Sequence, residues 1–247
     1  RITESLDLEW TFEYAKSFSP TSRVVVEEFL EGQQYSTESV ITDEKNITLG
    51  FAERNYEFLE ELSPYIIENG GQQPAKIDKK ELDSIVKLVE KSSQILGISN
   101  ATSKGDVVMT KEGPKIIEIA PRLSGGYFSS DQIPLATGIN VIEIAIRLSL
   151  GEKINKDKLL FRHQNAVAIR YFFPKPGKIT SISNIDSFKN ESWVHKLNLF
   201  FGVGDVLEKV TDHTKRCGFV ITTGNTRDEA VERAKTVVKN VQILTRQ

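Results

Sequence analysis

The sequence predicts an α+β fold, in which helices and mostly antiparallel strands occupy separate stretches of the chain. Helix start signals precede apolar residues at helical spacing in several places. Between these helices lie runs rich in Val, Ile, Phe and Tyr, and short turns separate several of them, which favours antiparallel pairing.

Four helices carry recognisable start signals. In the later ones a capping Asp, Asn or Thr precedes a Glu by three residues, the pattern of a capping box. Gly97 and Gly151 supply stop signals. The expected helices run from Ser5 to Phe18, Asp78 to Leu96, Asn140 to Leu150 and Thr226 to Val241.

The strands are predicted from β-branched and aromatic runs. A turn at Thr110–Pro114 joins two of them into a hairpin. A polar, charged stretch at 151–161 suggests a domain boundary near residue 155. The expected strands are 24–30, 35–41, 47–53, 105–109, 115–120, 166–173, 178–182, 197–201, 205–210 and 219–223.

Composition narrows the function classes. The 247 residues include 32 Lys+Arg and 34 Asp+Glu, a net charge of -2, which gives no general attraction for nucleic acid or an anionic membrane. No apolar run is long enough to span a membrane. A single cysteine, Cys217, excludes an internal disulfide. With no apolar leader and no initiator Met, the chain is expected to be cytoplasmic and part of a longer protein.

The hairpin carries two carboxylates that can share a face. With a turn at Thr110–Pro114, Asp106 faces Glu118, and directly opposed side chains lie close together. A divalent cation with oxygen ligands would convert their repulsion into a metal site. A loop one residue different would separate them, and pairing of Glu118 with a Lys or Arg is an equally open alternative.

A basic and glycine-rich loop follows this hairpin. Arg122 offers a planar fork that suits phosphate oxygens, and Gly125 and Gly126 permit close backbone approach to a ligand. Two acids, an arginine and a glycine loop together favour a site for a metal and a nucleotide's phosphates.

The 24–30 segment is a candidate for binding a nucleotide base. An extended backbone exposes donors and acceptors that match the edge of adenine, and Phe29 and Leu30 would supply apolar walls. Gln34 lies where it can contact ribose hydroxyls, although an ordinary turn residue is the simpler interpretation. Glu27 and Glu28 point to opposite faces of a strand, so at most one of them should line the cleft.

Together these segments resemble the ATP-grasp superfamily, in the branch that holds carbamoyl-phosphate synthase and biotin carboxylase, and are closest to the L-amino acid ligases. The residues that carry the resemblance are Val26–Gly32, Lys104–Asp106 and Ile116–Gly126, and Asn165–Ile179 is similar to the ligases' C-terminal domain. The resemblance implies a small-subdomain tail and hinge at 1–30, a nucleotide- and metal-binding subdomain at 31–155 and a C-terminal α+β domain at 156–247.

The resemblance also implies residue roles. One of Glu27 and Glu28, with the backbone of Phe29 and Leu30, would bind adenine, and Gln34 stands where the family usually has a ribose-binding Glu. Asp106 and Glu118 would hold Mg²⁺, for which Mn²⁺ could substitute, and Arg122 would steady an acyl phosphate. Ala120 replaces a further metal ligand. The segment Ser124, Gly125 and Gly126 would bind substrate. Independently of the resemblance, Arg170 and Arg216 are candidates to reach the cleft from the C-terminal domain.

The implied function is an ATP-dependent carboxylate–amine ligase acting through an acyl phosphate, with small-molecule carboxylate and amine substrates, no nucleic acid or membrane partner, and a possible homodimer. Two alternatives stay open: a degenerate nucleotide-binding module without catalysis, and an ATP-dependent carboxylase or phosphoribosylamine–glycine ligase. The family's phosphate-binding lysines and glycine-rich loop would precede residue 1, so this chain alone is expected to bind ATP weakly and to turn over little.

Overall fold

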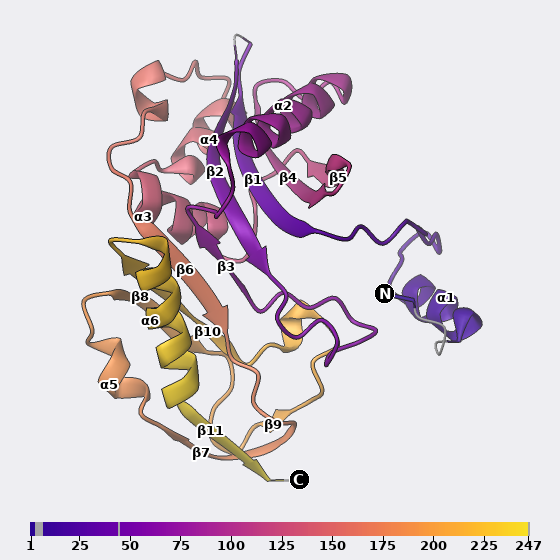
Figure 1. The fold of residues 1–247 in the computed structure, drawn as a ribbon, viewed down its shortest axis with the longest axis vertical. Coiled ribbons are helices and arrows are strands. Elements are labelled where there is room, and N and C mark those ends of the chain that lie inside the picture. The colour runs from indigo at the N-terminus through magenta and orange to yellow at the C-terminus, as the bar shows by residue number, and fades with distance from the viewer. Residues whose placement is uncertain (3–6, 44, 247) are drawn as a thin grey trace.

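The computed structural model describes residues 1–2, 7–43 and 45–246. A long antiparallel sheet runs through both halves of the described chain, with helices against it (Figure 1). Its strand order is β5-β4-β1-β2-β3-β6-β10-β8, and a smaller sheet has the order β11-β7-β9. The α+β class predicted from the sequence is confirmed.

The elements follow one another as helices α1 to α6, strands β1 to β11 and short helical turns η1 to η3. In chain order they are α1 (Leu8–Ser17), β1 (Gln33–Ile41), β2 (Asn46–Asn55), β3 (Gly70–Gln73), α2 (Lys79–Ile95), β4 (Ala101–Thr110), β5 (Gly113–Ala120), η1 (Phe128–Gln132), α3 (Ile133–Thr137), α4 (Val141–Ser149), η2 (Lys156–Leu159), β6 (Ala166–Tyr171), β7 (Gly177–Ser183), α5 (Ile185–Lys189), β8 (Val194–Leu199), β9 (Val206–Leu207), η3 (His213–Lys215), β10 (Gly218–Gly224), α6 (Arg227–Asn240) and β11 (Gln242–Arg246).

The predicted caps begin three of the long helices. The side chains of Asp78, Asn140 and Thr226 accept hydrogen bonds from backbone N–H groups three residues later, at the starts of α2, α4 and α6. The cap predicted at Ser5 lies outside the described residues. Asp7 caps α1, and its side chain accepts hydrogen bonds from the N–H groups of Glu9 and Trp10.

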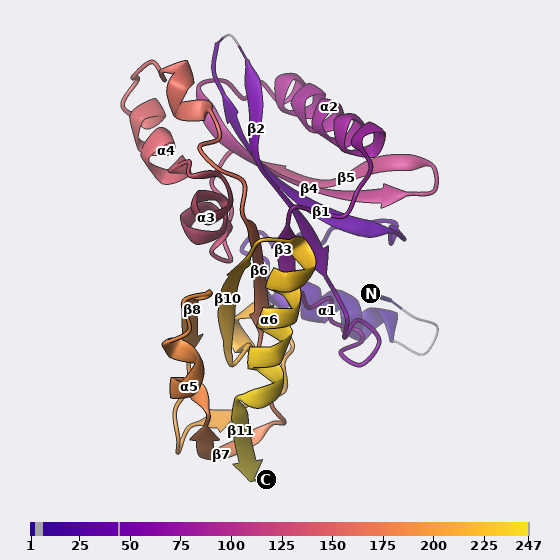
Figure 2. The same ribbon diagram turned by 60° about the vertical axis from the view of Figure 1, so that its left-hand side comes forward.

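The two faces of the large sheet are covered differently near β1. Tyr35 packs with Ile85 and Val89 of α2 on one face. On the other face Val40 packs with residues of α3 and α4, among them Ile133. Figure 2 shows α2 on one side of the strands and α3 and α4 on the other. Side chains near the start of β1 that point away from α2 are therefore left for a cleft.

The sheet also joins the two expected regions of the chain. β3 pairs antiparallel with β2 on one side and with β6 on the other. Beyond it, α6 packs its Ala234 and Val237 against β6 and β10, beside Ala168 and Val220. The C-terminal region is therefore continuous with the sheet that carries the hairpin, while the domain boundary at residue 155 remains a prediction.

The strand predicted at 24–30 is wrong. These residues pair with no strand among those described, and Val25 and Val26 are 78% and 77% exposed. Their β-branched side chains favour a strand only where a neighbouring strand supplies hydrogen bonds and packing.

Within the described chain no helix is long and apolar enough to cross a bilayer.

Candidate functional site

A row of polar side chains lies on the face of β1 that α2 leaves free. Gln34, Ser36 and Glu38 are two residues apart, so all three point to the same face. On the neighbouring strand β4, Ser36 pairs with Asp106 and Gln34 with Val108. These strands form the floor of two adjoining cavities, one charged and one largely apolar.

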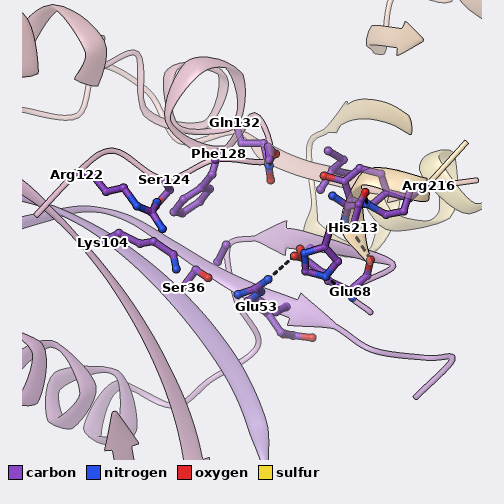
Figure 3. A pocket seen from close by; sticks show the side chains of 17 residues that line it. Ser36, Glu53, Glu68, Lys104, Arg122, Ser124, Phe128, Gln132, His213 and Arg216 are labelled. Atoms are coloured by element: carbon purple, nitrogen blue, oxygen red, sulfur yellow. Dashed lines mark hydrogen bonds and ion pairs between the residues drawn. The ribbon is translucent and has the colours of Figure 1, made fainter. Parts of the chain in front are cut away.

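The charged cavity has a volume of about 230 Å³. Strands β1, β2 and β4 supply one side, the loop after β5 supplies a second, and the C-terminal region supplies the third (Figure 3). The lining residues include Ser36, Glu53, Arg54, Glu68, Lys104, Arg122, Ser124, Gly125, Gly126, Gln132, Tyr171, His213 and Arg216.

Asp106 and Glu118 are directly paired across the β4–β5 hairpin, so the facing arrangement predicted from the sequence is confirmed. The register differs from the expected one. Met109 faces Pro114 rather than Lys115, and a bulge next to Asp106 then shifts the pairing by one residue. Without that bulge the turn would have placed the two carboxylates out of register.

Cations surround Asp106, which is only 5% exposed. Its Oδ2 lies 3.0 Å from Arg54 Nη1 and 2.6 Å from Lys104 Nζ, and its Oδ1 accepts from Ser36 Oγ at 2.7 Å. Burial opposes ionisation, but Arg54 and the bonds from Lys104 and Ser36 outweigh it and hold the pKa of Asp106 below its usual value. The carboxylate is therefore charged and fully paired.

Lys104 bridges the two carboxylates. Its Nζ also lies 3.3 Å from Glu118 Oε1, and Arg122 Nη2 is 3.4 Å from the same oxygen. In the structure Glu118 therefore forms ion pairs with Lys104 and Arg122, as the alternative interpretation expected. Among the described residues no group of three or more His, Cys, Asp or Glu is arranged to hold a metal.

The carboxylate pair nevertheless fits a magnesium ion under one condition. The two side chains converge on a single point where a cation, the Lys104 ammonium, already lies. A flexible lysine can leave, and Mg²⁺ completes its shell with water and phosphate oxygens, so two carboxylates suffice. A metal held by this pair would require Lys104 to release both acids.

The loop after β5 is anchored by Glu38, a residue that sequence reasoning missed. Glu38 is fully buried, and its Oε2 accepts from Ser124 N at 2.8 Å and from Ser129 Oγ at 2.6 Å. Burial raises the pKa of Glu38, although the bonds from Ser129 and Ser124 act in the opposite direction. Its only sequence signal was its two-residue spacing from Ser36.

The loop itself leaves room beside the cavity. A Cβ added at Gly125 would meet nothing within 4 Å, and one at Gly126 would come 3.4 Å from the Tyr171 hydroxyl. Gly126 has a φ of 61°, in the left-handed region that favours glycine. Arg122 lines the cavity and donates to its neighbour's carbonyl, Leu123 O, at 3.1 Å.

The second cavity, of about 490 Å³, brings together the residues predicted to bind a nucleotide. Glu27 and Glu28 both line it, contrary to the expectation of at most one, because this segment is not a strand with alternating faces. Apolar side chains from β4, β5 and the loop after β2 complete the walls. Its lining residues are Glu27, Glu28, Phe29, Leu30, Gly32, Gln34, Tyr56, Leu59, Ile66, Val108, Lys115, Ile116 and Ile117.

The C-terminal region contributes to the charged cavity through η3. Arg216 lines it as predicted, whereas Arg170 is buried and donates instead to Gly71 O and to Gln72. His213, which no spacing singled out, also lines the cavity. Its Nε2 accepts from the Glu68 N–H at 3.2 Å, and burial, with a smaller effect from Arg216, lowers the pKa of the imidazole.

Two segments of the chain match known family models. Residues 8–126 match the ATP-grasp domain. Residues 170–246 match the L-amino acid ligase C-terminal domain 2. The chain therefore contains a segment that matches the ATP-grasp domain, followed by a segment that matches the L-amino acid ligase C-terminal domain 2.

Individual relatives are distant. An uncharacterized protein, y4rH, of Sinorhizobium fredii is 25% identical over 207 residues, which are 84% of this chain and 41% of the relative. The L-amino acid ligase of Bacillus licheniformis has a TM-score of 0.78 at 17% identity, over 89% of this chain and 55% of that one. Phosphoribosylglycinamide synthetase of Anaerococcus prevotii has a TM-score of 0.75 at 16% identity, over 100% and 63%.

These likenesses to solved structures are below 25% identity and show a shared fold. The chain also spans less than two thirds of the length of each of these relatives.

Proposed function

We propose that the protein is an ATP-dependent carboxylate–amine ligase that activates a carboxylate as an acyl phosphate and passes it to an amine. The observation that carries this proposal is the succession of the two cavities along one sheet face. Gln34 lines the apolar one and Ser36, two residues further along β1, lines the charged one. An extended nucleotide can lie across both.

The apolar cavity would hold the base of ATP. Phe29 and Leu30, with Val108 and Ile116 opposite, offer the apolar walls that a flat heterocycle requires. Gln34 would bind ribose hydroxyls by hydrogen bonds without the assistance of a charge.

The charged cavity would hold the phosphates and Mg²⁺, or Mn²⁺ in its place. Asp106 and Glu118 are the residues that would hold the metal, which supplies positive charge to the transferring phosphoryl group when bound. Lys104, once released from the acids, would remain close enough to contact phosphate oxygens.

The reaction itself needs no side-chain nucleophile. A substrate carboxylate oxygen attacks the γ-phosphorus, the bond to the β-phosphate oxygen breaks, and ADP leaves. The amine nitrogen then attacks the acyl carbon, phosphate leaves, and the amine loses a proton. Arg122 would offset charge on the phosphoryl group, and the loop Ser124–Gly126 would place the acyl group against it.

A second candidate is a nucleotide-binding module without catalysis. It is favoured by Lys104, whose Nζ lies 2.6 Å from Asp106 and 3.3 Å from Glu118, because an ammonium there competes with a metal. Ala120, in place of a further ligand, points the same way.

The test is metal-dependent ADP release by the full-length protein with amino acid mixtures. Asp106→Ala and Glu118→Ala should abolish it, whereas Glu112→Gln, on the exposed turn of the same hairpin, should not. Unchanged release in both alanine variants would reject the metal assignment. Nucleotide binding without release in the wild type would favour the second candidate. A homodimer and a cytoplasmic location remain predictions.

A further inference from the structure

Arg216 differs from the other cations that line the charged cavity. Arg54, Lys104 and Arg122 each form an ion pair with Asp106 or Glu118. Within the described part of the chain, Arg216 has no carboxylate partner. Its charge is therefore not neutralised by the protein, and the cavity is left with a cation that can bind an anion.

The guanidinium of Arg216 is nevertheless held in place. Its Nη1 donates to Glu68 O at 3.2 Å and its Nε donates to His213 O at 2.9 Å. Its Cζ lies 3.5 Å from the centre of the Tyr171 ring. Contacts to carbonyl oxygens and a ring face orient the group but leave its charge and its Nη2 hydrogens for a ligand.

His213 adds a second donor at the same place. Because its Nε2 accepts from the Glu68 N–H, the neutral ring carries its proton on Nδ1. Burial and the neighbouring Arg216 favour this neutral form. Both residues line the same cavity, and a guanidinium together with an imidazole N–H suits a carboxylate, which is planar and singly charged.

An outer cavity of about 580 Å³ opens beside these two residues and shares them with the charged cavity. Tyr127, Tyr171 and Phe200 form an aromatic wall around it. The ring of Tyr127 stacks on Phe219 at 4.1 Å and has the Lys196 ammonium 5.0 Å from its centre, and Phe200 lies 5.8 Å from the Phe219 ring. The wall suits an aromatic or large apolar group.

We propose that Arg216, His213 and the aromatic wall form the binding site for the amine substrate, which carries a carboxylate on an aromatic or large apolar skeleton. This rests on the proposed ligase function. Arg216 would bind the carboxylate that does not react, and Tyr127 and Phe200 would select the side chain.

The location of Arg216 supports this assignment over binding of the reacting carboxylate. Figure 3 shows Arg122 and Arg216 at opposite ends of the charged cavity. The carboxylate to be phosphorylated must lie near Asp106, Glu118 and Arg122. An anion held by Arg216 is therefore a different group, and it reaches the reacting centre from the C-terminal side.

The test compares three probes by isothermal titration calorimetry, without ATP: L-phenylalanine, L-phenylalaninamide, which lacks the carboxylate, and L-alanine, which lacks the ring. The full-length protein is compared with Arg216→Gln, Phe200→Ala and the control Lys215→Gln. Lys215 is the neighbouring cation, and it pairs with Glu208 at 2.6 Å outside the cavity.

The wild type should bind L-phenylalanine more tightly than its amide by about tenfold or more. Arg216→Gln should remove the difference in affinity between L-phenylalanine and its amide, whereas Lys215→Gln should keep it. Phe200→Ala should reduce the ratio of the affinity for L-phenylalanine to that for L-alanine. The proposal is overturned if L-phenylalanine does not bind at about 10 mM, if Arg216→Gln still discriminates acid from amide, or if L-alanine binds as tightly. Because these binding measurements need no ATP, they can still be interpreted if the protein proves not to catalyse the ligase reaction. In turnover, Arg216→Gln should raise KM for the amine more than it lowers kcat.

Discussion

Asp106 lies directly opposite Glu118 because a bulge beside Asp106 shifts the pairing of the β4–β5 hairpin by one residue. The bulge brings two carboxylates to one point on the cleft face, and Lys104 lies between them. Whether a divalent cation can displace that ammonium decides what the protein does.

Replacing Lys104 with Met should tighten metal binding. The substitution keeps the apolar stem but removes the charge that competes for Asp106 and Glu118. We expect affinity for Mn²⁺ in the absence of nucleotide to rise by about tenfold, as measured by electron paramagnetic resonance. Lys111→Met, on the exposed turn of the same hairpin, is the control. Equal Mn²⁺ affinity in Lys104→Met and wild type would show that Lys104 does not guard the site.

Glu38 should make the free energy of unfolding fall as pH rises, which is opposite to the usual effect of a carboxyl group whose pKa is lowered on folding. Because its pKa is raised on folding, the native state holds the proton at pH values where the unfolded chain has lost it. This contribution is fully present below the unfolded pKa of about 4.3 and is lost as pH rises through the higher folded value.

Glu38→Gln removes that titration. The melting temperature of the variant relative to wild type should therefore increase as pH rises from about 4.5 towards neutrality. Glu61→Gln, an exposed residue, should show no such trend. A difference independent of pH would mean that Glu38 is equally easy to ionise in both states.

The link between η1 and the C-terminal region should be sensitive to Asp131. This carboxylate is nearly buried and lies 2.5 Å from Lys196 Nζ and 3.3 Å from His195 Nε2. Asp131→Ala removes one partner of a charge-assisted bond, and the free energy of unfolding should fall by about 1.5–3 kcal/mol, measured by urea denaturation. Asp186→Ala, whose partner Lys189 is exposed, should change it by less than about 0.5 kcal/mol. Equal effects of the two variants would contradict this role.

The apolar cavity can be tested without disturbing the core. Ile66 lines it and is 44% exposed, so Ile66→Glu places a charge beside the expected base with little cost to folding. Binding of a fluorescent ATP analogue should weaken by about tenfold. Ile142→Glu is the control, since Ile142 lies on α4 and is 38% exposed. An unchanged affinity in Ile66→Glu would place the base elsewhere.

Local signals explain how much of the fold the sequence predicts. The capping residues of α2, α4 and α6 act over three residues, and β1 and β2 lie in runs that include β-branched and aromatic residues, so both signals are visible in the sequence. β3 pairs with β2 and with β6, but Gly70–Gln73 has no apolar alternation that would indicate a strand in the sequence. The segment 24–30 has the β-branched residues of a strand, but a strand also needs a neighbouring strand to pair with, which residue propensity does not reveal.

Candidate site residues were predictable where they lie close together in the sequence, as in the hairpin with its loop and in the segment 27–34. The hairpin acids and the glycine loop lie within a single stretch of sequence. The contacts of Glu38 with Ser124 and of Arg216 with Glu68 join residues far apart in the chain, so no spacing could reveal them. The bulge beside Asp106, which sets the pairing with Glu118, is not specified by any turn rule.

The most direct measurement is anomalous diffraction from crystals of the full-length protein with ATP and Mn²⁺. We predict one manganese peak between Asp106 and Glu118, with Lys104 turned away from both and the base against Phe29 and Leu30. A nucleotide bound elsewhere, or Lys104 still bridging the two acids with no manganese between them, would contradict the central claim.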